Sequence, residues 1–583
     1  MNIREYLARG KPLLFDGAMG TYYAARPGRA GARCELAGAE ETGAIHRAYL
    51  DAGARAVRTN TFDLAGLDAP SVVGTACRAA LDAAEPYGAY VFADLGPAPG
   101  EGAAPAEHYR GLADLFLGRG LSHFIVETLP TDEGIPELAR YLKERRPGAF
   151  LLASFAVGPD GTTREGLSGR TLFERTAALE GVDAVGFNCV SGPRHLLEFV
   201  RGLDLSVLNG KFLSVMPNAG YPTVLGRRVV YQGAPDYFGE LLAQTAGAGA
   251  HIVGGCCGTT PAHIAQAARA LEGPGVRLFA QPAQPRAESA AQPGRNRLRD
   301  KLEAGRRVVA VELDPPADDQ VEAFMDGVRL LRDAGADAVT VADCPVGRPR
   351  ADSCLLACKI RRETGVEPLP HMTCRDRNLN ATKALLLGLS MEGVHNVLLV
   401  TGDPIPDQDR DEVKSVFNFN SRKLIRYVSG LADGGLSTPF QIFGALNVNA
   451  PNFPKQLELA AEKEEAGAAG FLTQPVHSPR ALQNLALARQ TLKGKILGGV
   501  FPIVSHRNAL FLNNEVAGVS VPEDIVKRYE GLGREAAEAL ALELSVKTAR
   551  DMAPYTDGWY LMTPFRRVAL IARIMAELRR DGK

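Results

Sequence analysis

Three cysteines are the residues of this chain whose type and position most directly predict chemistry. Cys256 and Cys257 are adjacent, stand between glycines and end an apolar run, and Cys189 ends another apolar run. Neighbouring side chains of a strand point to opposite faces, so adjacent cysteines can bind one metal only where the strand ends and the backbone bends. The flanking glycines allow such a bend. Three thiolates and one open position would describe a zinc site that activates an incoming thiol. Three buried free cysteines are the alternative.

The bulk composition limits the classes of protein to which the chain can belong. Its 583 residues are too many for one hydrophobic core, so at least two domains are expected. The formal net charge of -1 gives no electrostatic reason to bind nucleic acid or an acidic membrane surface. No apolar run approaches the roughly 18 residues of a membrane span, and Met1–Arg9 lacks the apolar core of a signal peptide. The nine scattered cysteines fit a reducing compartment, so we expect a cytoplasmic protein.

One segment interrupts the pattern of the chain. Residues 281–294 are rich in Pro, Gln and Ala and poor in large apolar side chains, which is typical of a linker. We predict a first domain over residues 1–278, a linker over 279–297 and a second domain over 298–583. A long surface loop within one domain is the alternative.

Each side of this segment holds eight short β-like runs that alternate with helix-like stretches. Such alternation predicts a parallel sheet, and eight units in each half predict an α/β protein with two (β/α)8 TIM-type barrels. An open doubly wound sheet alternates in the same way, but the glycine pattern of a nucleotide-binding loop is missing. The runs of the first half are 13–15, 56–59, 90–93, 124–126, 150–153, 184–187, 212–215 and 251–253. Those of the second half are 308–311, 338–341, 368–371, 397–400, 440–443, 470–473, 496–500 and 559–562.

The barrel hypothesis predicts where the chemistry takes place. Active sites of these barrels lie at the carboxyl ends of the strands, and the distinctive polar residues of both halves follow the predicted strands. Cys189, Cys256 and Cys257 would then lie together although they are distant in the sequence. This favours the zinc hypothesis over three separate core cysteines.

The motifs of the first half resemble those of the homocysteine S-methyltransferase family. The matching stretches, in order along the chain, are Asp16–Thr21, Thr59–Phe62, Glu127–Thr128, Gly186–Cys189, Pro217–Gly220 and Gly254–Gly258. The resemblance implies Zn2+ bound by Cys189, Cys256 and Cys257, with homocysteine as a further ligand. Zinc deprotonates a bound thiol near neutral pH, and the sulfur would attack an activated methyl group to give methionine.

The same resemblance assigns Asp16 and Glu127 to the substrate ammonium group. A structural carboxylate that caps a helix or pairs with an arginine is the alternative for both. Asn218 is expected to shape a turn near the metal and to bind substrate, with a plain turn asparagine as the alternative. We expect His46 and His251 to be core or hydrogen-bonding residues, because three cysteines already suffice. The methyl donor stays open among S-methylmethionine, S-adenosylmethionine, a betaine-like compound and a methyl-folate.

The second half resembles methylenetetrahydrofolate reductase over most of its length. Its matching stretches include Val311–Pro316, His371–Asn378, Asn396–Pro404, Ala466–Ala468 and Thr473–Gln474. The resemblance implies bound FAD that is reduced by NADH or NADPH. The flavin would then reduce 5,10-methylenetetrahydrofolate to 5-methyltetrahydrofolate, so that the cofactor carries the hydride chemistry and the protein sets position and electrostatics.

Glu312 is the predicted general acid of this half. Opening the methylene bridge requires a proton on the departing amine nitrogen, and burial can keep a carboxyl group protonated near neutral pH. Asp403 is expected beside the flavin and pterin, as a catalytic and cofactor-binding residue, and Gln474 suits a pterin edge. An arginine-paired glutamate and a helix cap are the alternatives for Glu312 and Asp403. The resemblance further assigns FAD contacts to His371, Thr373, Asn378, Gly402, Asn447 and Lys463.

The leading hypothesis is a bifunctional enzyme of one-carbon metabolism. Its partners would be homocysteine, a methyl donor, folate and a reduced nicotinamide, with neither nucleic acid nor membrane involved and with a homo-oligomer possible. The alternative is an active folate reductase fused to a zinc- or homocysteine-binding barrel with a regulatory or structural role.

Overall fold

The protein forms two compact units, Met1–Ala290 and Ala291–Lys583. The computed structural model describes residues 2–100, 104–225, 228–231, 233–272, 296–403, 414–433, 436, 438–515 and 519–580. Most of the predicted linker, residues 279–295, lies outside the described residues. The boundaries of the two domains and of the linker therefore stay a prediction.

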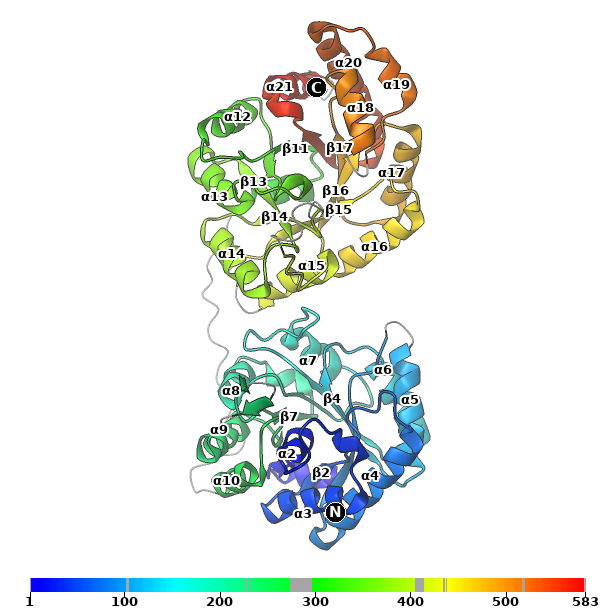
Figure 1. Ribbon diagram of the computed structural model, residues 1–583, viewed down its shortest axis with the longest axis vertical. Coiled ribbons are helices and arrows are strands. Elements are labelled where there is room, and N and C mark those ends of the chain that lie inside the picture. The colour runs from blue at the N-terminus through cyan, green and yellow to red at the C-terminus, as the bar shows by residue number, and fades with distance from the viewer. Residues whose placement is uncertain are drawn as a thin grey trace. The chain divides into compact units, whose positions relative to one another are not determined.

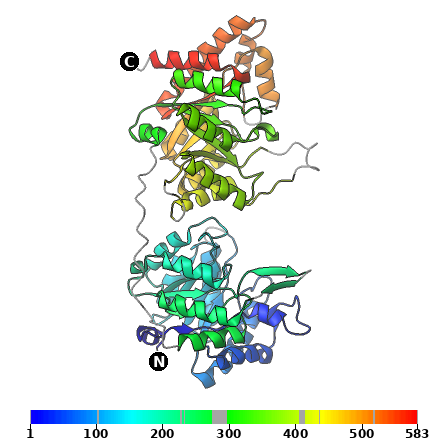
Figure 2. The ribbon, with the colours of Figure 1, turned by 90° about the vertical axis from the view of Figure 1, so that its left-hand side faces the viewer.

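The first unit is a parallel barrel of eight strands in the order β1-β10-β7-β6-β5-β4-β3-β2. A parallel bridge between Phe15 and Ala56 joins the first strand to the last. The strands are β1 Leu13–Leu14, β2 Ala56–Arg58, β3 Tyr90–Leu95, β4 His123–Leu129, β5 Phe150–Phe155, β6 Ala184–Asn188, β7 Phe212–Met216 and β10 Ile252–Val253. Two further strands, β8 Pro222–Leu225 and β9 Arg228–Tyr231, pair as an antiparallel hairpin that projects from this unit (Figure 2).

Helices form an outer layer around these strands (Figure 1). They are α1 Ile3–Ala8, α2 Gly20–Ala24, α3 Ala39–Asp51, α4 Ala69–Ala84, α5 Ala104–Leu117, α6 Ile135–Arg145, α7 Gly169–Ala177, α8 Pro193–Arg201, α9 Pro235–Gly247 and α10 Pro261–Leu271.

The second unit repeats the architecture as a closed parallel barrel from β11 to β18. Its strands are β11 Val308–Leu313, β12 Ala338–Val341, β13 Glu367–Thr373, β14 Asn396–Val400, β15 Gln441–Leu446, β16 Gly470–Pro475, β17 Lys495–Val500 and β18 Gly558–Met562. Its helices are α11 Arg297–Glu303, α12 Glu322–Asp333, α13 Ser353–Thr364, α14 Leu379–Met391, α15 Ser421–Gly430, α16 Phe453–Glu465, α17 Pro479–Thr491, α18 His506–Glu515, α19 Glu523–Arg528, α20 Arg534–Met552 and α21 Val568–Arg580.

The predicted fold class is confirmed, because every predicted strand run overlaps a strand of one of the two barrels. The sequence reasoning missed the β8–β9 hairpin and the pair of short helices α18 and α19 between β17 and α20. Neither was predicted, because neither belongs to the alternating strand–helix units that the hydrophobic pattern of the sequence indicates.

Each barrel is filled by its own interior cluster and is closed at the amino ends of its strands by a short helix. Ile3 and Leu7 of α1 join the interior cluster of the first barrel, and Leu298 and Leu302 of α11 join that of the second. Arg4 fixes α1 by donating to the carbonyl oxygen of Ala149, at 2.6 Å, just before β5. The amino ends are thus covered in both barrels, and the strand ends that remain for chemistry are the carboxyl ends.

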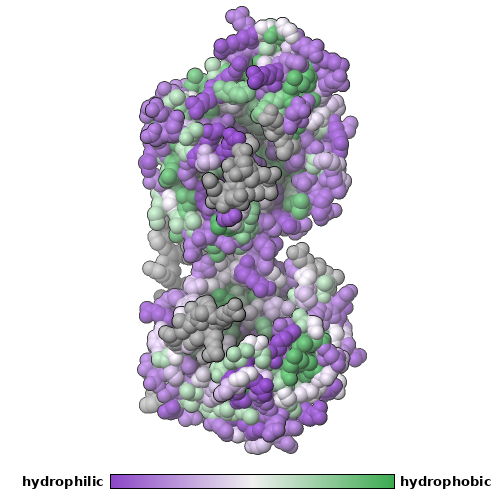
Figure 3. Space-filling view, viewed as in Figure 1, coloured by the Kyte–Doolittle hydropathy of each residue, from purple (hydrophilic) through white to green (hydrophobic). Residues whose placement is uncertain are grey.

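The surface agrees with a barrel whose apolar residues lie within. Hydrophilic residues cover most of the face of each unit that is visible in Figure 3, and apolar residues gather in smaller patches. Among the described residues, no helix combines the length and apolar character needed to cross a membrane.

The interior cluster makes a prediction about stability. Phe150 is fully buried in the first barrel, where its ring stacks on Phe212 at 6.3 Å between centroids. Phe150→Ala should cost about 3–5 kcal/mol, because it leaves a cavity that a closed barrel cannot fill by collapse. Calorimetric unfolding of the full chain should show the loss. The control is Leu81→Ala on α4, where the side chain is 40% exposed and little change is expected. An unchanged unfolding profile of Phe150→Ala would contradict this role of the interior cluster.

Candidate active sites

The three predicted cysteines converge at the carboxyl end of the first barrel. Cys189 follows β6, and Cys256 and Cys257 follow β10. Their sulfur atoms all lie within 4.8 Å of one another, and the Cys189 and Cys257 sulfurs are 3.7 Å apart. Cys256 is buried and the other two are partly exposed. Soft sulfur donors at this spacing suit a thiophilic cation such as zinc.

The thiols of this cluster resist ionisation when no cation is present. Contact with Cys256 lowers the pKa of Cys189, but contact with Cys257 and burial outweigh this effect and raise that pKa to about 12. The pKa of Cys256 is raised well above its usual value, first by its contact with Cys189 and further by burial. Three thiolates held this closely need a positive charge among them, which a bound metal would supply.

The backbone is strained at Cys189 and at nearby residues of the first barrel. Thr128, Cys189 and Val190 have φ values of 61°, 60° and 55°, in the left-handed region that residues other than glycine rarely adopt. Hydrogen bonds hold the strained segment, since the amide of Cys189 donates to the carbonyl oxygen of Met216 at 3.1 Å. Strain of this kind persists only where surrounding structure enforces it, and it gathers at functional sites.

The loop that carries Cys256 and Cys257 is fixed by a glycine and a threonine. Gly258 has a φ of 80°, and a side chain there would collide with the ring of Tyr231 at 2.3 Å. The hydroxyl of Thr259 donates to the carbonyl oxygen of Cys256 at 2.7 Å and accepts from the amide of Ala18 at 3.0 Å. The cysteine loop and the loop after β1 are therefore one connected surface.

Tyr231 brings the β8–β9 hairpin to the same site. Contact with Cys189 lowers the pKa of Cys257, but contact with Cys256 and burial outweigh this effect and raise that pKa to about 12. A hydrogen bond with the hydroxyl of Tyr231 acts in the lowering direction and has the smallest effect of these. The sequence pattern did not indicate this contact, because the hairpin lies outside the barrel repeat.

A buried arginine, Arg58 of β2, joins the two carboxylates that were assigned to the substrate ammonium. Its Nε donates to Asp16 at 2.9 Å and its Nη1 to Glu127 at 2.8 Å. Its Nη2 donates to the carbonyl oxygens of Gly17 and Gly255 at 2.9 and 2.8 Å. The structure thus places Asp16 and Glu127 together, with a cation of the protein between them. Their contact with substrate stays a prediction.

Asn188, the last residue of β6, links this charged group to the cysteines. Its Nδ2 donates to Thr128 Oγ1 at 2.9 Å and to Glu127 Oε2 at 3.3 Å, and lies 3.8 Å from the sulfur of Cys256. Its Oδ1 accepts from the hydroxyl of Ser154 at 2.8 Å. The sequence reasoning assigned no role to Arg58 or Asn188. Arg58 and Asn188 are each a polar residue in an otherwise apolar strand, and this sequence feature could have identified them as candidates.

The remaining candidates of the first half occupy buried positions. Asn218 is buried beside the cysteine loops, its amide donates to the carbonyl oxygen of Ser191 at 3.1 Å, and its Oδ1 meets no partner among the described residues. His46 is fully buried, and burial lowers its pKa to about 4, so its ring is neutral. His251 accepts a hydrogen bond from the amide of Leu213 at 3.2 Å. Both histidines are thus core or hydrogen-bonding residues, as predicted.

Glu312 lies at the carboxyl end of β11 in the second barrel. Burial raises the pKa of this carboxyl group to about 7, helped by the nearby Asp314, while a hydrogen bond from Tyr560 acts in the opposite direction. The Nε2 of His371 is 3.6 Å from the same carboxyl group. Because burial also lowers the pKa of His371 to about 4, the imidazole is neutral and offers no compensating charge. A group with this pKa exchanges protons near neutral pH.

A second polar network holds the strand ends beside Glu312. Asp343, after β12, accepts from the amide of Thr373 at 2.9 Å and from Arg377 at 2.6 Å. Gly402, after β14, has a φ of 97°, and a side chain there would approach the Cβ of Thr373 to 3.0 Å. The next residue, Asp403, is exposed, and its carbonyl oxygen accepts from Arg375. Thr373, Gly402 and Asp403 thus share one rim.

Three further predicted cofactor contacts, Asn378, Asn447 and Lys463, already have partners within the protein. Asn378 caps α14 by accepting from the amide of Ala381 at 2.9 Å. The Oδ1 of Asn447 accepts from the amide of Asn449 at 3.0 Å. Lys463 donates to the carbonyl oxygen of Ala445 at 2.8 Å, and burial lowers its pKa to about 8. Gln474 is half-buried near the end of β16. Their contacts with FAD or pterin stay predictions.

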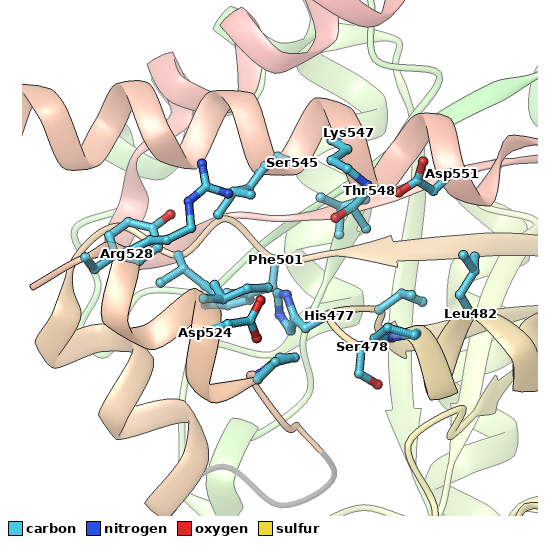
Figure 4. Close-up of a pocket in the computed structure, with 18 residues that line it drawn as sticks. His477, Ser478, Leu482, Phe501, Asp524, Arg528, Ser545, Lys547, Thr548 and Asp551 are labelled. Carbon is cyan, nitrogen blue, oxygen red and sulfur yellow. Dashed lines mark hydrogen bonds and ion pairs between the residues drawn. The ribbon is translucent and has the colours of Figure 1, made fainter.

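A cavity of about 500 Å³ lies elsewhere in the second unit (Figure 4). Residues of α17, α19 and α20 line it together with residues that follow β16 and β17. His477, Phe501, Asp524, Arg528 and Asp551 are among its lining residues, and none of the predicted site residues is. The cavity therefore lies between the helical layer and the carboxyl ends of β16 and β17.

Comparison with known proteins assigns each half to a family. The model of the family described as homocysteine S-methyltransferase matches residues 13–271, and that described as methylenetetrahydrofolate reductase matches residues 297–578. The methionine synthases of Mycobacterium tuberculosis and Mycobacterium leprae are each 33% identical to this chain over 256 and 255 residues. Each match covers 39% of this chain but 21% of the relative, so the chain spans about a fifth of the length of these relatives.

Solved structures are similar to part of the chain as well. The homocysteine methyltransferase MmuM from Escherichia coli in its apo form is 28% identical, with 45% of this chain and 97% of that chain covered and a TM-score of 0.36. Its metallated form is 25% identical, with 46% and 99% covered and a TM-score of 0.37. By the two family models, the chain joins two enzyme domains, one of the homocysteine S-methyltransferase family over residues 13–271 and one of the methylenetetrahydrofolate reductase family over residues 297–578.

Proposed function

We propose that the first barrel transfers a methyl group to the thiol of homocysteine, with zinc bound by Cys189, Cys256 and Cys257, and that the product is methionine. The observation that carries this proposal is the convergence of three sulfur atoms within 4.8 Å at the carboxyl end of a barrel of this family. Zinc sites that do chemistry have three protein ligands and one position left for water or substrate. The three cysteines fit such a site.

The residues around the sulfurs have distinct tasks in this proposal. Zinc, when bound, would keep the substrate thiol ionised near neutral pH. The strained segments at Thr128 and Cys189 and the hydrogen bonds of Thr259 hold the sulfurs in place. The carboxylates of Asp16 and Glu127, with Arg58, give the surroundings a net negative charge that attracts an ammonium group.

We further propose that the second barrel reduces 5,10-methylenetetrahydrofolate to 5-methyltetrahydrofolate with FAD and NADH or NADPH. FAD, when bound, would supply the hydride. Glu312 would supply the proton to the amine nitrogen that leaves the methylene carbon, and its pKa of about 7 supports this role. Among the described residues, the buried Nε2 of His371 and Oγ1 of Thr563 meet no hydrogen-bond partner, and a bound cofactor would satisfy these polar positions at the carboxyl strand ends.

In this scheme Asp403 and Gln474 contact the pterin, and His371, Thr373, Asn378, Gly402, Asn447 and Lys463 approach the flavin. Since Asn378 and Asn447 already accept backbone hydrogen bonds, they would contact FAD through their remaining amide groups. The nine cysteines are free thiols, which supports a reducing compartment such as the cytoplasm.

A regulatory or structural first barrel is the competing proposal. The two are separated by assaying methionine formation from homocysteine by the zinc-loaded chain, with each candidate methyl donor supplied separately. Activity with a sulfonium donor alone would mean that the barrels run parallel reactions. Activity with methyl-folate, without added cobalamin, would mean that they form one pathway. No methionine with any donor would favour a barrel that only binds zinc or homocysteine.

The cysteine cluster makes the first functional prediction. Cys257→Ser should abolish stoichiometric zinc binding and methionine formation, because a neutral hydroxyl is a poor ligand for this metal. Flavin reduction by the second barrel should be unaffected. Zinc content and both activities are the measurements. Cys77→Ser is the control, since Cys77 is a buried cysteine of α4 outside the cluster. A folded Cys257→Ser variant that keeps its zinc would contradict the assignment.

The raised pKa of Glu312 leads to a second prediction, about the pH dependence of folate reduction. The carboxyl group donates only when protonated, so kcat/KM for the folate should fall as pH rises through about 7. Oxidation of the nicotinamide with a quinone as electron acceptor requires no such proton and should lack this limb. Glu312→Gln should lose folate reduction by roughly 100-fold or more, within the range for general acids, and keep nicotinamide oxidation. Wild-type folate turnover in this variant would remove Glu312 from the mechanism.

A further inference from the structure

Asp94 is a buried carboxylate of the first barrel to which the sequence analysis gave no role. It lies near the end of β3, opposite Ile125 of β4 in the register, and is only 5% exposed. Phe92, two residues earlier, belongs to the interior cluster, as do Ala56 and Ile125. Side chains alternate along a strand, so Arg58, Asp94 and Glu127, each two residues further along, form the next inward-facing layer toward the carboxyl end.

This layer holds more negative than positive charge. Arg58 directs Nε to Asp16, Nη1 to Glu127 and Nη2 to two backbone carbonyl oxygens. Both oxygens of Asp16 are engaged by Arg58, since Oδ2 accepts from its backbone amide at 3.0 Å. Asp94 receives none of these bonds, and its Oδ1 is buried without any partner among the described residues. One guanidinium therefore faces three carboxylates.

A buried carboxylate that lacks a hydrogen-bond partner destabilises the folded protein when it is charged, and the pKa of Asp94 reflects this effect. Burial raises the pKa of Asp94 well above its usual value, and the charge of Glu127 raises it further, while Arg58 acts in the opposite direction. Such a group is stabilised by a cation that can donate hydrogen bonds. In the part of the chain that the structure describes, the nearby guanidinium is already committed to other acceptors.

The position of Asp94 points to the substrate as that cation. Glu127 interacts with Asp94 and is joined through Asn188 to the sulfur of Cys256, by contacts of 3.3 and 3.8 Å. Among the described residues, only Oε2 of Glu127 takes part in a hydrogen bond, which leaves Oε1 open. Oδ1 of Asp94 and Oε1 of Glu127 are thus open, and Glu127 is connected to the thiols through Asn188.

We propose that Asp94, together with Oε1 of Glu127, binds the ammonium group of an α-amino thiol whose sulfur is directed to the cysteine cluster. Asp16 then serves as the structural partner of Arg58, and Asp94 determines the preference for thiols that carry an amino group. This inference rests on the proposed function of the first barrel, and it names a residue that recognises the substrate.

The test compares two thiols on zinc-loaded full-length protein. Homocysteine and 4-mercaptobutanoate share the sulfur and the carboxylate, but 4-mercaptobutanoate lacks the amino group. Asp94→Asn should weaken homocysteine binding, measured by calorimetric titration, by roughly 10- to 100-fold, the range for a hydrogen bond to a charged group. The affinity for 4-mercaptobutanoate should not change, and the KM for homocysteine should rise more than kcat falls.

Asp82→Asn is the matched control, because Asp82 is an exposed residue of α4 and its loss should change neither affinity. Zinc content and circular dichroism report whether the Asp94 variant is folded. If Asp94→Asn does not fold, Asp94→Ser removes the charge with a smaller side chain and gives the same comparison.

Two outcomes would overturn the inference. One is wild-type affinity of the Asp94 variant for homocysteine. The other is an equal loss of affinity for both thiols, which would mean that Asp94 maintains the shape of the site instead of recognising the amino group. If the wild-type protein binds neither thiol, the proposed function of the barrel fails, and this inference fails with it.

Discussion

A single buried guanidinium holds the carboxyl end of the first barrel together. Arg58 extends from β2 and donates to Asp16 after β1, to Glu127 of β4 and to the carbonyl oxygen of Gly255 after β10. Removal of one partner of a buried ion pair typically costs 3–5 kcal/mol, because the remaining charges stay buried without compensation. The positions of the acidic residues, the loop after β1 and the cysteine loop therefore all depend on this one side chain.

The constraint at Arg58 extends to the cysteines through backbone geometry. Gly255 precedes Cys256 directly, so a hydrogen bond to its carbonyl oxygen also fixes the start of the cysteine loop. On the other side, Asn188 connects Glu127 to Cys256 and precedes Cys189, whose φ of 60° is strained. The strained conformation persists because buried hydrogen bonds from several strands hold it in place. Charge pairing and sulfur placement are thus two aspects of one rigid arrangement.

The second barrel has the same architecture, but its buried carboxyl group, Glu312, is not paired with an arginine as Asp16 and Glu127 are in the first barrel. Among the described residues, no charged cation pairs with Glu312, since the nearby His371 is neutral and Tyr560 is the residue that donates a hydrogen bond to it. The result is a carboxyl group with a pKa of about 7, whereas Asp343, which follows the adjacent strand β12, is paired with Arg377. One fold can therefore pair one carboxylate with an arginine and leave its neighbour without that pairing, able to carry a proton near neutral pH.

The sequence by itself determined the two barrels and the convergence of the three cysteines. Strand periodicity is local, and parallel barrels gather the ends of their strands on one side, so residues after predicted strands could be placed together without coordinates. The pairing of charges was decided only by the tertiary structure. Arg58 and Asp94 look alike in sequence, as single charged residues in apolar strands, and only the inward-facing layer shows that one is fully paired and the other is not. The β8–β9 hairpin and the contact of Tyr231 with Cys257 were likewise beyond the sequence, because they depend on side-chain approach between segments with no shared period.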